Sequence, residues 1–327
     1  MKKRSHCDSG KALLVLLLTC LSGLGGVSNL LAVDQPPANS APAPAAPPEP
    51  TPTKADISYG PNPHQLMDIY LPPQGTGPFP VVIHYGTIWK PGKRAPGLAP
   101  FFAGHCAVVS VETRTMTDAV ADKVAVPVSY VLLDARRAVQ FVRFHAAEYN
   151  FDPDRIATTG SSQGTLPALY VACAGEQADP ASADPVERVS TKVTCVGAAI
   201  SQPSIDPKQM QEWVPGVEWG APALGCTFAE SLQKRDQLLP IIQKWSPDAL
   251  LNQDTPPIYF QNHWGLTKPP EIDKMTYLVH SPLWGLGFQK LAESRGATVY
   301  VDFPGHPSGK YKDMNDFIVK QLHPNSK

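Results

Sequence analysis

A short stretch of small and polar residues, Gly160-Ser161-Ser162-Gln163-Gly164, has the spacing of a serine nucleophile site. It lies between a predicted strand at residues 155–159 and a predicted helix at residues 163–174. Glycines two residues before and after Ser162 let a strand and a helix cross closely, so a strained turn can expose the hydroxyl. The backbone amide of Gln163 then faces a developing oxyanion. We predict Ser162 as the nucleophile rather than Ser161; the alternative is a glycine–serine turn without chemistry.

The elements around this turn alternate between strand and helix along the chain. Apolar patterns predict strands at residues 65–71, 79–85, 106–111, 193–200, 257–261 and 297–303, and helices at residues 130–149, 283–294 and 314–322. Such alternation predicts an α/β fold with a mostly parallel central sheet and helices on both faces. The alternation breaks at residues 201–245, which we interpret as an insertion that serves as a lid or as packing.

The region from Ile57 to Leu322 resembles the α/β-hydrolases, nearest the secreted esterase and lipase branch with its acetylxylan- and feruloyl-esterase-like enzymes. The resemblance is carried by LMDIYLP (66–72), FPVVIHYG (79–86), the segment 134–164, the segment 246–260 and Pro304-Gly305-His306. It implies an α/β-hydrolase fold, a structural role for Asp134 and a catalytic order of serine, acid, histidine. It also implies that the reaction needs no cofactor or metal.

A serine hydroxyl needs a neighbouring imidazole to accept its proton. His306 follows the last predicted strand, where the resemblance places the catalytic histidine, so we expect it to be the base. His263 and His280 are rivals that precede this strand. We expect His280 to cap a helix or to bind backbone.

The acid that orients the histidine has no match at the family's usual place, because residues 261–266 contain no carboxylate. Asp273 is the first candidate and Glu271 the second. If neither carboxylate reaches the base, the site is a serine–histidine dyad or Asn262 orients the ring.

The resemblance also implies an HGGG-type loop that completes the oxyanion hole, and residues 84–89 (HYGTIW) stand at its place. Only Gly86 keeps a matching glycine, so the amides of Gly86 and Gln163 are the predicted oxyanion donors. We expect Trp89, Tyr85 and Trp213 to contact substrate, with ordinary packing as the alternative for the two tryptophans.

The bulk properties limit the partners and the location. A net charge of −1 and a pI near 6.7 favour neither nucleic acid nor an anionic membrane surface. Basic residues at positions 2–4 and an apolar run at 12–18 predict a signal peptide within residues 1–33. A Pro/Ala-rich linker is predicted at 34–56 and the hydrolase domain at 57–325. Membrane attachment would require an uncleaved signal or lipidation of Cys20.

Four cysteines follow the predicted signal: Cys106, Cys173, Cys195 and Cys226. Export permits a disulfide, with three complete pairings open, although a free buried thiol is the simpler interpretation of Cys106. The sequence contains neither a CxxC nor an HExxH motif, so it predicts no metal site.

These observations together predict an exported serine esterase, periplasmic or extracellular, that cleaves small-molecule or polysaccharide esters through an acyl-enzyme. One alternative is a hydrolase-fold binding protein that no longer turns over, suggested by the altered oxyanion loop. Another is a peptidase of the prolyl-oligopeptidase type, which the lack of a preceding propeller disfavours.

Overall fold

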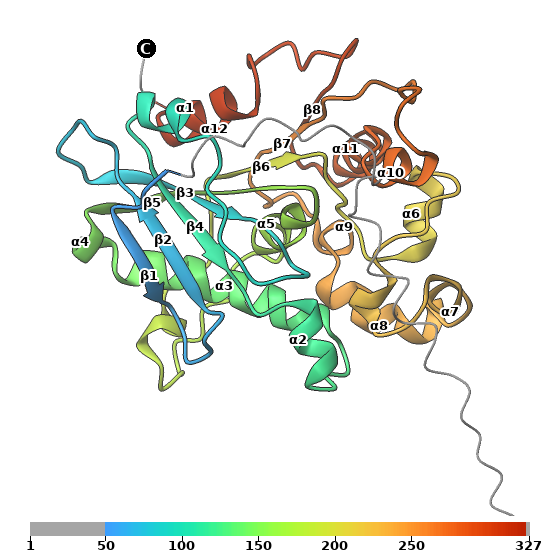
Figure 1. Ribbon diagram of the computed structural model, residues 1–327, viewed down its shortest axis with the longest axis horizontal. Helices are drawn as coiled ribbons and strands as arrows, with labels where there is room; N and C mark the ends of the chain where they lie inside the picture. Colours follow the sequence, from blue (N-terminus) through green and yellow to red (C-terminus); the bar gives the residue numbers. More distant parts are fainter. Residues whose placement is uncertain (1–49, 325–327) are drawn as a thin grey trace, which may run out of the picture. The chain divides into compact units, whose positions relative to one another are not determined.

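The computed structural model describes residues 50–324 (Figure 1). Their centre is an eight-stranded sheet in the order β1-β2-β4-β3-β5-β6-β7-β8. The strands are β1 (Lys54–Ser58), β2 (Leu66–Tyr70), β3 (Phe79–Tyr85), β4 (Ala107–Glu112), β5 (Phe151–Ser161), β6 (Cys195–Ala199), β7 (Ile258–Gln261) and β8 (Val299–Asp302).

The sheet is parallel from β4 to β8, and only the pairs β1–β2 and β2–β4 are antiparallel. All seven residues of β3 are buried, which explains its unbroken apolar sequence, because a central parallel strand is covered on both faces. The carboxyl ends of β3, β5, β6, β7 and β8 therefore meet at one edge of the sheet, where a site in such a fold is expected.

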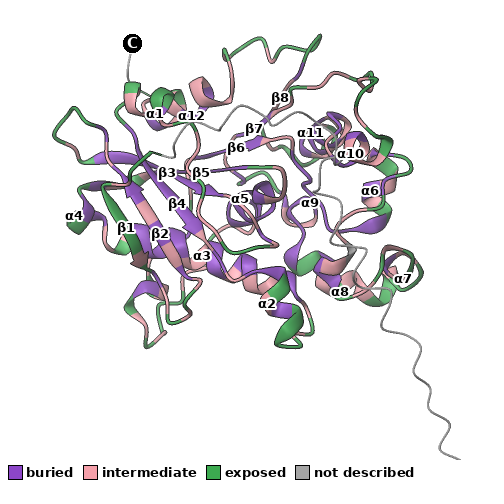
Figure 2. Ribbon diagram, viewed as in Figure 1, coloured by how far each residue is buried: buried purple, intermediate pink, exposed green. Residues whose placement is uncertain are grey.

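Helices cover both faces of the sheet, as expected from the alternating pattern (Figures 1 and 2). The helices α3 (Val128–Phe144), α5 (Thr165–Cys173) and α11 (Leu283–Arg295) pack on one face through residues such as Val131, Leu169 and Phe288. The helices α1 (Leu98–Ala103) and α12 (Met314–Leu322) pack on the other through Phe101 and Phe317.

The remaining helices are short. They are α2 (Met116–Ala121), α4 (Ala146–Tyr149), η2 (Ser162–Gly164), η3 (Pro185–Arg188), α6 (Pro207–Trp213), η4 (Ala221–Leu224), α7 (Phe228–Gln233), α8 (Arg235–Trp245), α9 (Pro247–Leu250) and α10 (Lys274–Val279). Four of them, α6, η4, α7 and α8, lie within the segment 201–245 that interrupts the alternation. Helix α6 packs on α11, and α8 packs on α9.

Several elements depart from the sequence-based boundaries, and the predicted helix at residues 130–149 is divided into α3 and α4. Strand β1 begins at Lys54, inside the predicted linker, because it pairs with β2 in spite of its exposed, polar composition. Helix α10 lies in a region where the sequence pattern predicted no element. The predicted signal peptide, Cys20 and the linker up to residue 49 lie outside the described residues. Within residues 50–324, the structure contains no helix long and apolar enough to cross a membrane.

The four cysteines after the predicted signal are all free thiols. Cys106, Cys173 and Cys195 are buried, and burial raises the pKa of the Cys106 thiol to about 12. They are therefore small core residues, and none of the possible disulfide pairings is formed.

Candidate active site

The turn between β5 and α5 has the strained geometry expected of a nucleophile elbow. Ser162 has a φ of 50°, in the left-handed region that residues other than glycine rarely adopt. A Cβ on Gly160 would lie 2.2 Å from the Gly164 carbonyl oxygen, and a Cβ on Gly164 would lie 2.1 Å from the Tyr85 carbonyl oxygen. Both glycines are therefore required by the close approach of backbone, and Ser162 stands at the tip of the turn.

The imidazole at Ser162 belongs to His280. The Nε2 atom of His280 lies 2.8 Å from Ser162 Oγ, and its Nδ1 atom lies 3.1 Å from the Thr276 carbonyl oxygen. In the tautomer with a proton on Nδ1, that N–H donates to the carbonyl and the unprotonated Nε2 can accept the serine proton. The pair thus has the geometry that general-base activation of a serine requires.

Two amide side chains hold the backbone on either side of this imidazole. Asn262, at the end of β7, donates from Nδ2 to the His280 carbonyl oxygen at 2.7 Å. Gln202, after β6, donates from Nε2 to the Val279 carbonyl oxygen at 2.8 Å. His280 ends α10, so these two bonds tie the helix end to the carboxyl edge of the sheet.

His306 does not make the expected contact with Ser162. The chain turns back after β8, where Phe303 and His306 form an isolated antiparallel bridge. The exposed ring of His306 stacks on Phe303 with centroids 4.8 Å apart. The pairing predicted from its position after the last strand is therefore corrected to His280. His263 is exposed and packs edge-on against Trp264.

The predicted acids do not reach this histidine either. Asp273 is the N-cap of α10, and hydrogen bonds from the Thr276 side chain and the Thr276 amide lower the pKa of its carboxyl group. Asp273 and His280 flank opposite ends of the helix, and seven residues at 1.5 Å each separate them by about 10 Å. Glu271 is exposed in the preceding loop. Asn262 bonds the His280 carbonyl and so contacts its backbone.

The loop after β3 lies directly over the elbow and carries Gly86, one predicted oxyanion donor. Gln163 fixes it, because its Oε1 accepts from the Ile88 amide at 2.9 Å and from Thr87 Oγ1 at 3.2 Å. Helix α2 holds the loop from the other side, since the Met116 amide donates to the Ile88 carbonyl oxygen. Gln163 thus has two roles. Its backbone amide lies beside Ser162, and its side chain holds in place a loop that lacks the run of glycines in the HGGG-type sequence.

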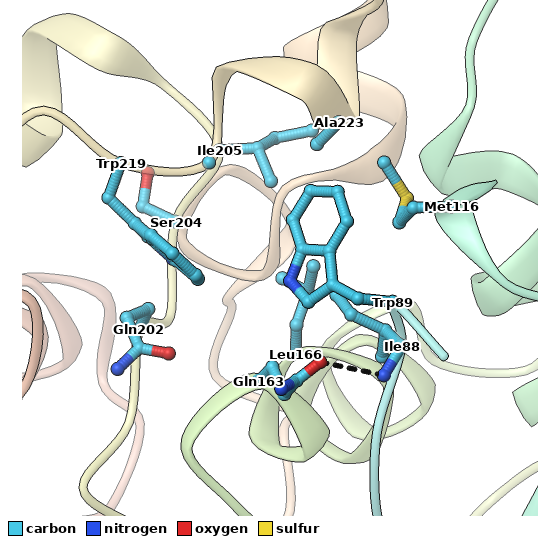
Figure 3. A pocket seen from close by; sticks show the side chains of 11 residues that line it. Ile88, Trp89, Met116, Gln163, Leu166, Gln202, Ser204, Ile205, Trp219 and Ala223 are labelled. Carbon is cyan, nitrogen blue, oxygen red and sulfur yellow. Dashed lines mark hydrogen bonds between the residues drawn. The ribbon is translucent and has the colours of Figure 1, made fainter. Parts of the chain in front are cut away.

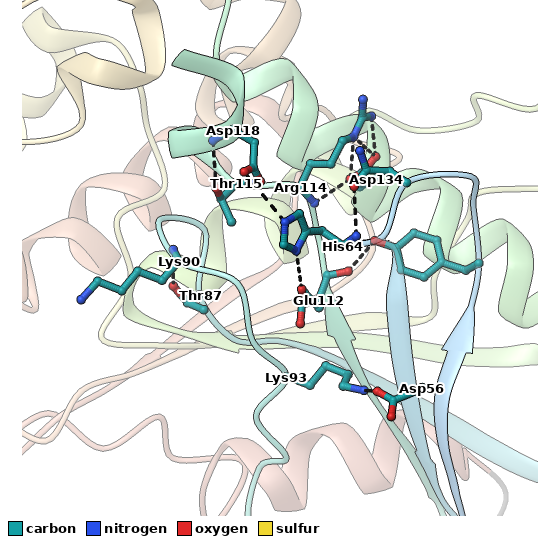
Figure 4. Close-up of polar contacts among 12 residues, drawn as sticks. Asp56, His64, Thr87, Lys90, Lys93, Glu112, Arg114, Thr115, Asp118 and Asp134 are labelled. Carbon is teal, nitrogen blue, oxygen red and sulfur yellow. Dashed lines mark hydrogen bonds and ion pairs between the residues drawn. The ribbon is translucent and has the colours of Figure 1, made fainter. Parts of the chain in front are cut away.

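A polar cluster behind this loop anchors α2 (Figure 4). Asp134, 1% exposed, receives bonds from Nε and Nη2 of Arg114, which supports the structural role expected for it. His64 Nδ1 lies 2.8 Å from Glu112, and Thr115 and Asp118 form a capping box at the start of α2. These contacts connect the β4–α2 turn to the main sheet.

His84 is buried in the strand that leads into the oxyanion loop. Its neighbours in register are Ser110 on β4 and Thr159 on β5. Burial lowers the pKa of His84 from 6.5 to about 4, so the ring is neutral at neutral pH. Among the described residues, its Nδ1 has no hydrogen-bond partner.

The three residues expected to contact substrate differ in their surroundings. Trp89 lines a cavity beside Gln163, together with Leu166 and Trp219 (Figure 3). Tyr85 is 2% exposed, and its hydroxyl donates to the Ala135 carbonyl oxygen, which places it in the core. Trp213 packs on α11, where a Cβ on Gly287 would lie 2.3 Å from its ring. Tyr85 and Trp213 are therefore packing residues in this structure.

Comparison with known proteins supports a family assignment. The BD-FAE family profile matches residues 67–262, a span that includes most of β2, the elbow and β7. Over 115 residues the chain is 35% identical to a probable isoprenylcysteine alpha-carbonyl methylesterase of Arabidopsis thaliana. That match covers 34% of this chain and 23% of the plant protein.

Two solved structures show the same fold. A truncated carbohydrate esterase from gut microbiota superposes with a TM-score of 0.60 at 20% identity, covering 83% of this chain and 96% of that one. A bifunctional GH43-CE protein of Bacteroides eggerthii gives 0.56 at 21% identity, covering 82% of this chain and 38% of that one. The expected α/β-hydrolase fold is thereby confirmed.

Proposed function

Because the chain belongs to the BD-FAE family of α/β-hydrolases, a family of carboxylic ester hydrolases, we propose that it is a serine esterase with Ser162 as nucleophile and His280 as base. The observation that carries this assignment is the 2.8 Å contact between Ser162 Oγ and His280 Nε2. The strained φ of Ser162 supports it, since such strain accumulates at functional sites.

The reaction follows from this geometry. Ser162 Oγ attacks the ester carbonyl while His280 Nε2 accepts its proton. The backbone amides of Gln163 and Gly86 stabilise the oxyanion of the tetrahedral intermediate. His280 then returns the proton to the alcohol oxygen as the carbon–oxygen bond breaks. Water, deprotonated by His280, cleaves the acyl-enzyme and restores the serine.

The histidine is oriented mainly through its own helix in this proposal. The Thr276 carbonyl sets the tautomer by accepting from Nδ1. Asn262 and Gln202 fix the backbone at the end of α10. Rigid support of this kind limits the misplacement of the ring, which matters because small errors in geometry cost large factors in rate.

The substrate and the location extend the same proposal. Acyl esters of carbohydrates are the proposed substrate class, supported by the carbohydrate esterases among the structures of the same fold.

Export is proposed from the basic and apolar residues near the N-terminus. Mass spectrometry of protein secreted by an expressing bacterium tests export, and a mature protein that still begins at residue 1 would contradict it.

A fluorophosphonate probe and 4-nitrophenyl acetate test the activity. We expect wild-type protein to be labelled once per chain and to hydrolyse the ester, and Ser162→Ala to do neither. Ser161→Ala is the matched control, because the neighbouring serine is exposed and should retain labelling. Folded protein that resists the probe and cleaves no ester would instead favour a binding protein with a hydrolase fold.

A further inference from the structure

The loop after β7 places a tryptophan beside the proposed base. The ring of Trp264 meets the ring of His280 at an interplanar angle of 72°, with the two centroids 6.0 Å apart. Both residues are half-buried, so neither is closed off from solvent. Because His280 Nε2 lies 2.8 Å from Ser162 Oγ, a single imidazole ring separates the reacting serine from this indole.

Backbone and ring contacts hold Trp264 in this place. Asn262 Oδ1 accepts from the Trp264 amide at 2.9 Å, while Asn262 Nδ2 donates to the His280 carbonyl oxygen. The Tyr277 hydroxyl donates to the Gly265 carbonyl oxygen at 3.1 Å, and the Tyr277 ring packs against the indole with centroids 6.0 Å apart. The tryptophan and the histidine are therefore fixed relative to each other, and a surface ordered in advance binds a ligand at a lower entropic cost.

The same loop is open to solvent beyond these contacts. His263 is exposed, and Leu266 is 55% exposed, so the loop also presents an aliphatic side chain to water. A further turn supports the loop, because a Cβ on Gly265 would lie 3.2 Å from the Pro304 carbonyl oxygen. Trp264 is thus anchored but not covered, and an aromatic ring in this situation offers an apolar surface to a ligand.

The order of the strands assigns this surface to the alcohol side of the ester. Gly86 follows β3 and Gln163 follows β5, so the proposed oxyanion donors lie on one side of Ser162. Strand β7 lies two positions from β5 on the other side, and the Trp264 loop follows it. The leaving alcohol must lie at His280, because Nε2 returns the proton to its oxygen. The rest of the alcohol then extends along the β7 side.

We propose that Trp264 is a specificity residue for the leaving alcohol and stacks against one face of a pyranose ring. The C–H groups on a face of such a ring form an apolar surface, which an indole removes from water. The hydroxyl groups at the rim of the sugar stay hydrated, so the partly exposed position of Trp264 suits this ligand. The inference rests on the proposed esterase function and names the class of alcohol that the same site releases.

Two acetate esters of primary alcohols test this proposal. The alcohol of methyl 6-O-acetyl-β-D-glucopyranoside carries a pyranose ring, and the alcohol of ethyl acetate does not. We would measure kcat/KM for each ester and divide it by the rate constant for hydrolysis by hydroxide, which corrects for intrinsic reactivity. We expect wild-type protein to favour the pyranoside by about tenfold or more, the factor expected from burying roughly 60 Å² of apolar surface.

Variants of the loop separate stacking from support of His280. Trp264→Ala removes both, so kcat should fall for both esters, and loss of the indole face should lower the ratio between them about fivefold or more. Trp264→Phe keeps an aromatic face and should keep a preference for the pyranoside. Thr267→Ala is the matched control, because Thr267 is an exposed residue of the same loop, and this variant should leave the ratio unchanged.

The outcomes that contradict this inference differ from those that contradict the esterase function. An active wild-type enzyme with a ratio near one would overturn the inference and leave the esterase assignment intact. Equal losses for the two esters in Trp264→Ala, with folding checked by circular dichroism, would also overturn it, because Trp264 would then act only through His280. Failure of the wild-type protein to cleave any ester, 4-nitrophenyl acetate included, would remove the function on which the inference rests.

Discussion

Gly164→Ala tests whether the oxyanion loop depends on close packing against the elbow. The added Cβ would lie 2.1 Å from the Tyr85 carbonyl oxygen and 2.5 Å from that of Gly86. These are backbone atoms, and Tyr85 ends a strand paired on both sides with β4 and β5. The collision therefore cannot be relieved by a side-chain rotation.

The size of the effect follows from the distance. Ordinary contact begins at 3.4 Å, so the loop and the elbow must separate by 3.4 − 2.1 = 1.3 Å. A misplacement of about 1 Å costs on the order of 10²-fold in rate, and losing one oxyanion donor costs about 10²–10³-fold. We expect kcat to fall about 10²-fold or more while the protein remains folded.

The assay is kcat and KM for 4-nitrophenyl acetate, with the fluorophosphonate probe counting active sites and circular dichroism reporting the fold. Gly97→Ala is the matched control, because a Cβ at Gly97 meets nothing within 4 Å and its φ is −56°. If Gly164→Ala turns over within threefold of Gly97→Ala, the loop does not depend on this packing and the argument fails.

Two further predictions concern the ionisable side chains of His84 and Asp273. Folded His84 has a pKa of about 4 against 6.5 unfolded, so the folded state binds fewer protons between these values and stability falls as the pH drops from 6.5 to 4. At about 1.4 kcal/mol per pKa unit, the free energy of unfolding falls by about 3 kcal/mol over this range. Urea unfolding at pH 7 and at pH 4.5 should show a smaller fall in the free energy of unfolding for His84→Asn than for wild type. Equal falls in the two proteins would show that His84 is not the source of the pH dependence. Asp273→Asn should keep kcat/KM within threefold, because asparagine also caps a helix; a loss beyond thirtyfold would restore a catalytic role to the carboxylate.

The sequence pattern predicted the elbow well because its requirements are local. Gly160 and Gly164 are needed by backbone contacts within a few residues of Ser162 or with the adjacent strand. The central strands were equally clear, since burial on both faces gives an unbroken apolar run such as residues 79–85.

The histidine that contacts Ser162 was harder to predict, because tertiary structure decides which histidine lies beside the serine. Helix α10 has only six residues and a weak apolar pattern, although Asp273 at its N-cap was a usable signal. If Asp273 had been interpreted as an N-cap, a short helix after it would have been predicted to end near His280. His306 occupied the family's expected place, but the bridge between Phe303 and His306 turns the chain away.

The identity of the base is the central claim, and paired histidine variants test it most directly. We would compare kcat/KM for 4-nitrophenyl acetate in His280→Gln and His306→Gln, with folding checked by circular dichroism. Loss of a general base typically costs about 10²–10⁴-fold, so His280→Gln should fall in that range while His306→Gln stays within threefold of wild type. The reverse result, with His306 essential and His280 dispensable, would contradict the account.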